Sequence, residues 1–148
     1  MKFKETYIWD EATGTATCKI FNNKEEFVGQ AHCHNKDNDM MSEKVGCIIA
    51  SARARIAMCQ YLKKEETIRY KALIHFYNLI NHSKRSNPDS YEVKMLLKQM
   101  KSHREAIKAI NEDIELERKT LKKYIDEKDN MYQKIRKNRE KKNKAVNN

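Results

Sequence analysis

Hydrophobic and polar positions alternate in three short segments at the N-terminal end of the chain. Residues 6–9 are aromatic or β-branched, and small or apolar side chains recur at every second position of 15–21 and 26–34. This period is typical of strands with one buried face. The intervening residues 10–14 and 22–24 have turn-forming side chains. The pattern predicts a small antiparallel β-meander, which must pack on a helix or on a second subunit to be stable.

From residue 42 onward the period changes to that of an amphipathic helix. Ser42 and Glu43 are suited to the N-cap and the first turn. Apolar positions continue to about residue 82, and the pattern fits one helix over 42–82 as well as two helices separated near 63–67. The first apolar stripe consists of Val45, Ile48, Ile49, Ala52, Ile56 and Cys59.

A heptad repeat occupies the C-terminal part of the chain. The sequence Asn87-Pro88-Asp89 predicts a new helix with Asn87 as its N-cap. A helix over 88–138 would be about 75 Å long. No other predicted segment equals it in length, so we expect a coiled coil between copies of the chain. Ten of thirteen heptad core positions are apolar, the thirteen being Val93, Leu96, Met100, His103, Ile107, Ile110, Ile114, Glu117, Leu121, Tyr124, Lys128, Met131 and Ile135.

These patterns together predict an α+β protein. A small N-terminal antiparallel meander packs on long helices, and the C-terminal helix forms a coiled coil in an oligomer. We expect a ligand-binding domain of sheet and helix over residues 1–85 and a coiled-coil helix with a basic tail over 86–148.

Composition narrows the class of protein. Three glycines and one proline in 148 residues exclude a loop-rich or low-complexity chain. No apolar run is long enough to span a membrane, and residues 1–5 lack the apolar core of a signal peptide. The four cysteines are then expected to be reduced thiols rather than a disulfide framework. We expect a soluble cytoplasmic protein.

The positive charge is concentrated at the C-terminus. The formal net charge is +10, and residues 117–148 hold 12 Lys and Arg against five Asp and Glu, a balance of +7. Such a tail suits binding to nucleic acid or to an acidic partner. It equally suits a solvated helix end, where cations complement the helix dipole. The tail alone does not decide between these interpretations.

The sequence offers no convincing catalytic or metal-binding group. His32, Cys33 and His34 are adjacent, but strand alternation places Cys33 on the face opposite both histidines, so the three cannot bind one metal ion. Phosphate-binding glycine loops, zinc-protease motifs and nucleophile elbows are all missing. We therefore expect no catalytic residues, no metal and no cofactor.

Two arginines are the first candidates for ligand binding. On a helical wheel of 42–82, Arg55 lies inside the apolar arc and Arg53 lies at its edge. A guanidinium directed toward a core needs an anion or a carboxylate beside it. One interpretation is an ion pair with Glu43, with Asp37 or with an acid of a partner subunit. The other is a phosphate-binding site under the sheet, with His32 or His34 opposite.

A second group of candidates consists of Phe76, Tyr77, Asn87 and Arg104. An aromatic ring beside arginine and asparagine suits a ligand whose base is stacked while its phosphate is held. The alternative for Phe76 and Tyr77 is ordinary packing in a hydrophobic core.

A family resemblance rests on residues 28–54. A strand with Gly29-x-Ala31-x-Cys33 leads through an Asp-rich turn into a helix with Gly46 and Ile49-Ala50-x-x-Arg53-Ala54. This arrangement resembles the Thoeris anti-defence sponges of bacteriophages, over roughly residues 6–82. The resemblance implies a small sheet joined to long helices, assembled as dimers and larger oligomers. It also implies sequestration, without degradation, of cyclic ADP-ribose isomers made by host TIR proteins, with Arg53 as a ligand-binding residue.

The chain departs from that family at its C-terminus, where the heptads and the basic tail are longer than the family needs. We expect a phage protein that acts in the cytoplasm of the infected bacterium, is not an enzyme, and binds a cyclic nucleotide signal as a homo-oligomer. The alternative is a basic coiled-coil inhibitor that binds nucleic acid or protein, such as an anti-CRISPR or a DNA accessory factor. A third interpretation, a purely structural coiled-coil adaptor, assigns no function to the β-sheet.

Overall fold

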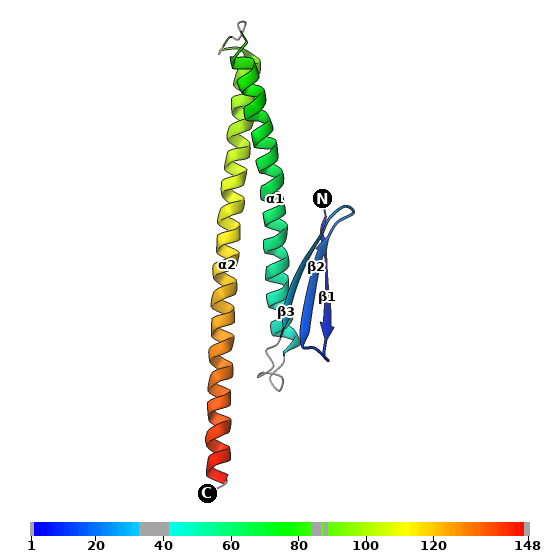
Figure 1. The fold of residues 1–148 in the computed structure, drawn as a ribbon, viewed down its shortest axis with the longest axis vertical. Helices are drawn as coiled ribbons and strands as arrows, with labels where there is room; N and C mark the ends of the chain where they lie inside the picture. The colour runs from blue at the N-terminus through cyan, green and yellow to red at the C-terminus, as the bar shows by residue number, and fades with distance from the viewer. Residues whose placement is uncertain (1, 33–41, 84–86, 88, 147–148) are drawn as a thin grey trace. The chain divides into compact units, whose positions relative to one another are not determined.

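The computed structural model describes residues 2–32, 42–83, 87 and 89–146. The predicted α+β class and the N-terminal antiparallel sheet are confirmed. Residues 33 and 34, expected to end the third strand, lie outside the described residues. The elements in chain order are β1 (Lys4–Asp10), β2 (Thr15–Phe21), β3 (Glu26–His32), α1 (Glu43–Asn81) and α2 (Tyr91–Val146) (Figure 1).

The sheet has the order β1-β2-β3, and both neighbouring pairs are antiparallel. In the turn after β1, Gly14 adopts a φ of 61°, which favours glycine, and Asp10 Oδ1 accepts a backbone N–H at 3.0 Å. Ala16, Cys18 and Ile20 of β2 are buried, while the residues between them are partly exposed. One face of the sheet therefore forms the core, as the alternation predicted.

Helix α1 lies very close to this buried face because the facing residues are small. A Cβ atom on Gly29 of β3 would overlap the backbone of α1 at Ala50 and Ala54. A Cβ atom on Gly46 of α1 would lie 3.3 Å from the ring of Trp9. Glycine is therefore required at position 29 for packing, since any side chain there would displace the helix.

The structure shows whether residues 42–82 form one helix and where the next helix begins. α1 is one continuous helix of 39 residues. α2 begins at Tyr91 because Ser90 Oγ accepts the Val93 N–H at 3.3 Å and serves as the N-cap. The prediction of Asn87 as N-cap is wrong, because its side chain instead accepts the Asp89 N–H at 3.0 Å. α2 continues to Val146 rather than 138, since the added residues include neither glycine nor proline.

The chain divides into two compact units. The first consists of residues 1–57 and 116–148, and the second of residues 58–115, so each unit takes part of both helices. The expected domain boundary after residue 85 stays a prediction. Within the described residues, neither helix combines the length with the apolar character that crossing a membrane requires.

Each unit has a polar contact between α1 and the heptad stripe of α2. In the first unit, Arg55 Nη2 lies 2.6 Å from Glu117 Oε1. In the second unit, Glu66 Oε2 lies 2.5 Å from His103 Nδ1. α1, although shorter, is therefore a partner for α2 inside the chain. The coiled coil between copies stays a prediction. The buried heptad residues are Val93, Leu96 and Ile114.

The Glu66 contact makes the second unit sensitive to acid. Besides His103, Glu66 accepts a hydrogen bond from Arg69 Nη1 at 3.0 Å. The bond to His103, and to a smaller extent the charges of His103 and Arg69, hold the pKa of the Glu66 carboxyl below its ordinary value of 4.5. A lowered carboxyl pKa stabilises the fold at neutral pH, and this stabilisation is lost as the pH falls through the folded-state pKa.

We predict that Gly29→Ala lowers the free energy of unfolding by about 3 kcal/mol, because the added methyl group meets helix backbone that cannot rotate away. Urea unfolding followed by circular dichroism measures the change. Val28→Ala is the control, since Val28 is exposed on the opposite face of the same strand. Equal stability of the Gly29 variant and the wild-type protein would contradict the close approach of α1 to β3.

A second prediction concerns Glu66→Gln. The substitution should lower the free energy of unfolding by about 1 kcal/mol at neutral pH, because it removes the charge that His103 and Arg69 contact. The difference from wild type should disappear well below pH 4.5, where the wild-type carboxyl is also neutral. Glu105→Gln is the control, since Glu105 is exposed and lies 3.9 Å from its partner Lys101. A difference that persists in acid would contradict the assignment.

Candidate anion-binding site

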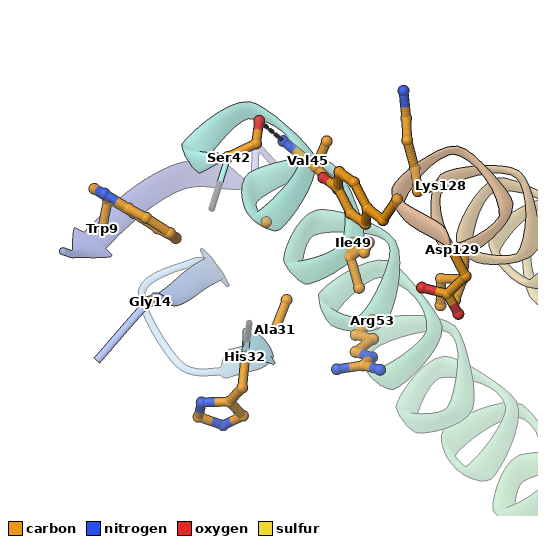
Figure 2. A pocket seen from close by; sticks show the side chains of 13 residues that line it. Trp9, Gly14, Ala31, His32, Ser42, Val45, Ile49, Arg53, Lys128 and Asp129 are labelled. Carbon is orange, nitrogen blue, oxygen red and sulfur yellow. Dashed lines mark hydrogen bonds between the residues drawn. The ribbon is translucent and has the colours of Figure 1, made fainter. Parts of the chain in front are cut away.

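The N-terminal end of α1 borders a cavity of about 190 Å³ in the first unit (Figure 2). One wall comes from the ends of β1 and β3, and another comes from the first turns of α1. The third wall comes from α2 around residue 128. The cavity is thus built from segments far apart in the sequence, which the packing of α1 on the sheet brings together.

Arg53 is the cation of this lining that is placed to bind an anion. Lys128 also belongs to the lining, but Figure 2 shows its amine directed away from the cavity, and its Nζ lies 5.3 Å from the centre of the Tyr124 ring. Arg53 Nη1 donates to the carbonyl of Gln30 at 2.5 Å, which holds the guanidinium beside the end of β3. A guanidinium has five N–H donors, so this bond leaves others for a ligand. His32 Nδ1 lies 2.8 Å from Thr15 Oγ1, on the outer face of the sheet, because Ala31 before it takes the buried face. The imidazole therefore borders the cavity and points away from α1 (Figure 2).

The rest of the lining is aromatic and apolar, and it includes the first turn of α1. Trp9 and Tyr132 supply rings, and Val45 and Ile49 supply aliphatic surface. Ser42 Oγ accepts the Val45 N–H at 3.3 Å, which caps α1 at the cavity (Figure 2). The first turn of a helix has a partial positive charge, so it adds to the attraction for an anion.

The cavity unites two of the predicted binding residues, His32 and Arg53. Arg55 has a different environment: its Nε and Nη2 donate to Glu117 Oε1 at 2.9 and 2.6 Å, and its Nη1 donates to Ser51 Oγ at 2.6 Å. The ion-pair interpretation therefore describes Arg55, but the acid is Glu117 of α2 rather than one of the predicted partners.

The remaining predicted residues are not part of this cavity. Phe76, Tyr77, Asn87 and Arg104 belong to the second unit. Phe76 is 54% exposed, so core packing does not explain it, and Arg104 is also exposed. Asn87 forms the turn before α2. His34 lies outside the described residues.

The lining residues that sequence analysis missed include Trp9, Lys128 and Tyr132. For Lys128 and Trp9, a feature of the sequence could have indicated a role in the site. Lys128 interrupts an otherwise apolar heptad position, and a polar residue at a core position marks a special environment. Trp9 is the single tryptophan and ends the predicted strand over 6–9. Tyr132 lies outside the heptad stripe and had no signal of its own.

A cluster of polar side chains between the sheet and α1 shows that Cys18 is not a reactive thiol. Glu5 Oε1 accepts hydrogen bonds from Ser51 Oγ at 2.7 Å, Tyr7 OH at 2.6 Å and Cys18 Sγ at 3.3 Å. These hydrogen bonds lower the pKa of Glu5, and the bond from Ser51 contributes most. The hydrogen bond to Glu5 raises the pKa of Tyr7. Burial raises the pKa of Cys18 to about 11, and the hydrogen bond to Glu5 is the second cause of this rise. Cys18 is therefore a protonated thiol at neutral pH rather than an activated nucleophile.

Among the described residues, no three His, Cys, Asp or Glu side chains are placed to hold a metal ion together. Comparisons of the chain with protein-family models, with curated proteins and with solved structures find no match. The function must therefore be inferred from the chemistry of the cavity.

Proposed function

We propose that the chain binds a small anionic nucleotide in the cavity of the first unit and holds it without cleaving it. The observation that supports this most is the presence of Arg53 and Trp9 in one cavity at the start of α1. A guanidinium holds phosphate through charge-assisted hydrogen bonds, and an indole ring stacks on a base. The helix start favours the same negative charge.

The resemblance described above favours a cyclic ADP-ribose isomer as the ligand. The chain would then be a phage anti-defence sponge that removes a signal made by host TIR proteins in the infected cell. The cavity of about 190 Å³ is smaller than the roughly 300–1,000 Å³ of common ligand sites. It would enclose one nucleoside half of such a ligand, while the other half stays outside.

The composition of the cavity supports sequestration over turnover. Among the described lining residues, His32 is the single imidazole and Asp129 the single carboxylate. Figure 2 shows them well apart, on β3 and α2, with Arg53 between them. Cleavage would require a nucleophile or a water molecule with a base in hydrogen-bond reach. A binding protein, rather than an enzyme, fits this arrangement.

The proposal includes a homo-oligomer, which the resemblance implies. Support in the structure comes from the distal heptad positions of α2. Met131 is 41% exposed, so part of the stripe is available to a helix of another copy.

Isothermal titration with a cyclic ADP-ribose isomer tests the ligand proposal. We expect tight binding, recovery of intact ligand after heat denaturation, and at least about tenfold weaker binding for Arg53→Gln. Arg104→Gln is the matched control, because Arg104 is an exposed arginine of the second unit. Circular dichroism verifies that both variants fold.

Two outcomes would contradict the proposal. Loss of binding in Arg104→Gln with full binding in Arg53→Gln would move the site to the second unit. A degraded ligand after incubation would replace sequestration by catalysis.

A second candidate function rests on the end of α2. Lys134, Lys137, Lys141 and Lys144 are exposed, and their spacing places them within an arc of about 80° on one helix face. Such a stripe follows a phosphate backbone, so we propose nucleic-acid binding as the alternative function.

For this alternative we predict that replacing these four lysines by glutamine abolishes duplex binding at physiological salt. The slope of log affinity against log salt should fall by about one unit per lysine. Fluorescence anisotropy with a labelled duplex measures both quantities. The control replaces four other exposed lysines of α2, Lys94, Lys98, Lys101 and Lys108. Equal loss in both variants would indicate unspecific attraction by net charge.

A further inference from the structure

The two edges of the sheet differ in how they are covered. β1 and β3 are the edge strands (Figure 1). On β3, Arg53 caps the Gln30 carbonyl, and Gly29 lies against α1. Among the described residues, β2 is the only strand that pairs with β1. The outer backbone groups of β1 are therefore available to another strand, which proteins usually prevent.

β1 also exposes apolar side chains on both faces. Ile8 is 55% exposed on the outer face, and Tyr7 is 49% exposed on the face that carries α1. Beside Tyr7, a groove of about 530 Å³ runs along α1 past Cys47 and Ile48, and Ile48 is itself 40% exposed. A free strand edge next to an apolar groove is a surface that favours association with a further strand.

We propose that the occupant of this surface is the β1 strand of a second copy, paired antiparallel about Tyr7. In that register Lys4 lies opposite Asp10, Glu5 opposite Trp9, and Thr6 opposite Ile8. All seven residues of Lys4–Asp10 are then paired. The two three-stranded sheets become one continuous sheet of six strands.

Charge complementarity selects this register. It places the positive Lys4 of each copy opposite the negative Asp10 of the other, so the interface has two favourable pairs. The Asp10 carboxylate accepts hydrogen bonds from Ala12 and Thr13 of its own turn and keeps its negative charge. Registers shifted by two residues leave part of β1 unpaired and separate Lys4 from Asp10. Glu5 does not oppose pairing, because its carboxylate already accepts hydrogen bonds from Ser51 and Tyr7.

The two-fold axis of such a pair is perpendicular to the sheet, so both α1 helices lie on the same face. The groove beside Tyr7 in one copy then adjoins the same groove of its partner, and the apolar surface of both is covered. This dimer uses a surface distinct from the heptad stripe of α2 and does not depend on the ligand proposal.

Sedimentation equilibrium of the full chain tests the proposal. We expect a dimer whose dissociation constant rises at least about tenfold in Ile8→Lys, because both copies lose apolar contact at the paired edge. Val28→Lys is the matched control: Val28 is a β-branched residue, 44% exposed on the same outer face, but on the opposite edge strand. Circular dichroism verifies folding of both variants.

Lys4→Glu tests the register, because it places a carboxylate opposite Asp10. We expect an at least fivefold higher dissociation constant at low salt, with a smaller effect at high salt. Lys2→Glu makes the same charge change outside β1 and should leave the dimer unaffected. A monomeric wild-type chain, or equal effects of Ile8→Lys and Val28→Lys, would overturn the proposal. Equal effects of Lys4→Glu and Lys2→Glu would overturn this register.

Discussion

The first unit depends on the close approach of α1 to the sheet. Gly29 leaves room for the helix backbone at Ala50 and Ala54, and this approach determines what the neighbouring residues can reach. Arg53 lies within the same helical segment, so its guanidinium comes to 2.5 Å from the Gln30 carbonyl at the end of β3. The cavity exists because a helix carrying an arginine lies directly on a strand that has no side chain at the point of contact.

The polar cluster around Ser51 fixes the position of α1 along the sheet. Ser51 donates to Glu5 of β1 and accepts from Arg55, which in turn contacts Glu117 of α2. The side chains of Arg55 and Glu117 are 46% and 30% exposed, so the ion pair itself adds little to stability. Its value is geometric, because a helix displaced by one turn would lose the hydrogen bond to Glu5 and those to Glu117 together, while the Ser51–Arg55 bond within α1 would remain.

Much of the fold could be predicted from local patterns. Alternation over 15–21 identified the buried face of β2. The periodicity after Ser42 identified α1 but not its buried residues, since Ala52 is the one buried member of the predicted stripe and Ile48 is 40% exposed. Asn87 was mistaken for the helix cap because asparagine and serine suit that position equally, and the hydroxyl of Ser90 took it. Whether α1 was one helix or two could not be decided, since tertiary contacts along its length are invisible in a helical wheel.

The candidate site could be predicted only in part, for a physical reason. His32 and Arg53 were found because their residue types and positions on a strand and a helix are local properties. Lys128 lies more than seventy residues further along the chain, and only the antiparallel packing of α2 on α1 brings it to the cavity. Arg55 had a stronger helical-wheel signal than Arg53, but its partner Glu117 was hidden by the same long-range packing.

The central claim is that the cavity at the start of α1 is where a nucleotide binds. Trp9 lines that cavity and is the only tryptophan of the chain, so its fluorescence reports on this site alone. Titration with a cyclic ADP-ribose isomer should produce a saturable change in Trp9 emission, with a midpoint equal to the calorimetric dissociation constant. Unchanged emission in a titration that releases heat would place the nucleotide elsewhere and contradict the account.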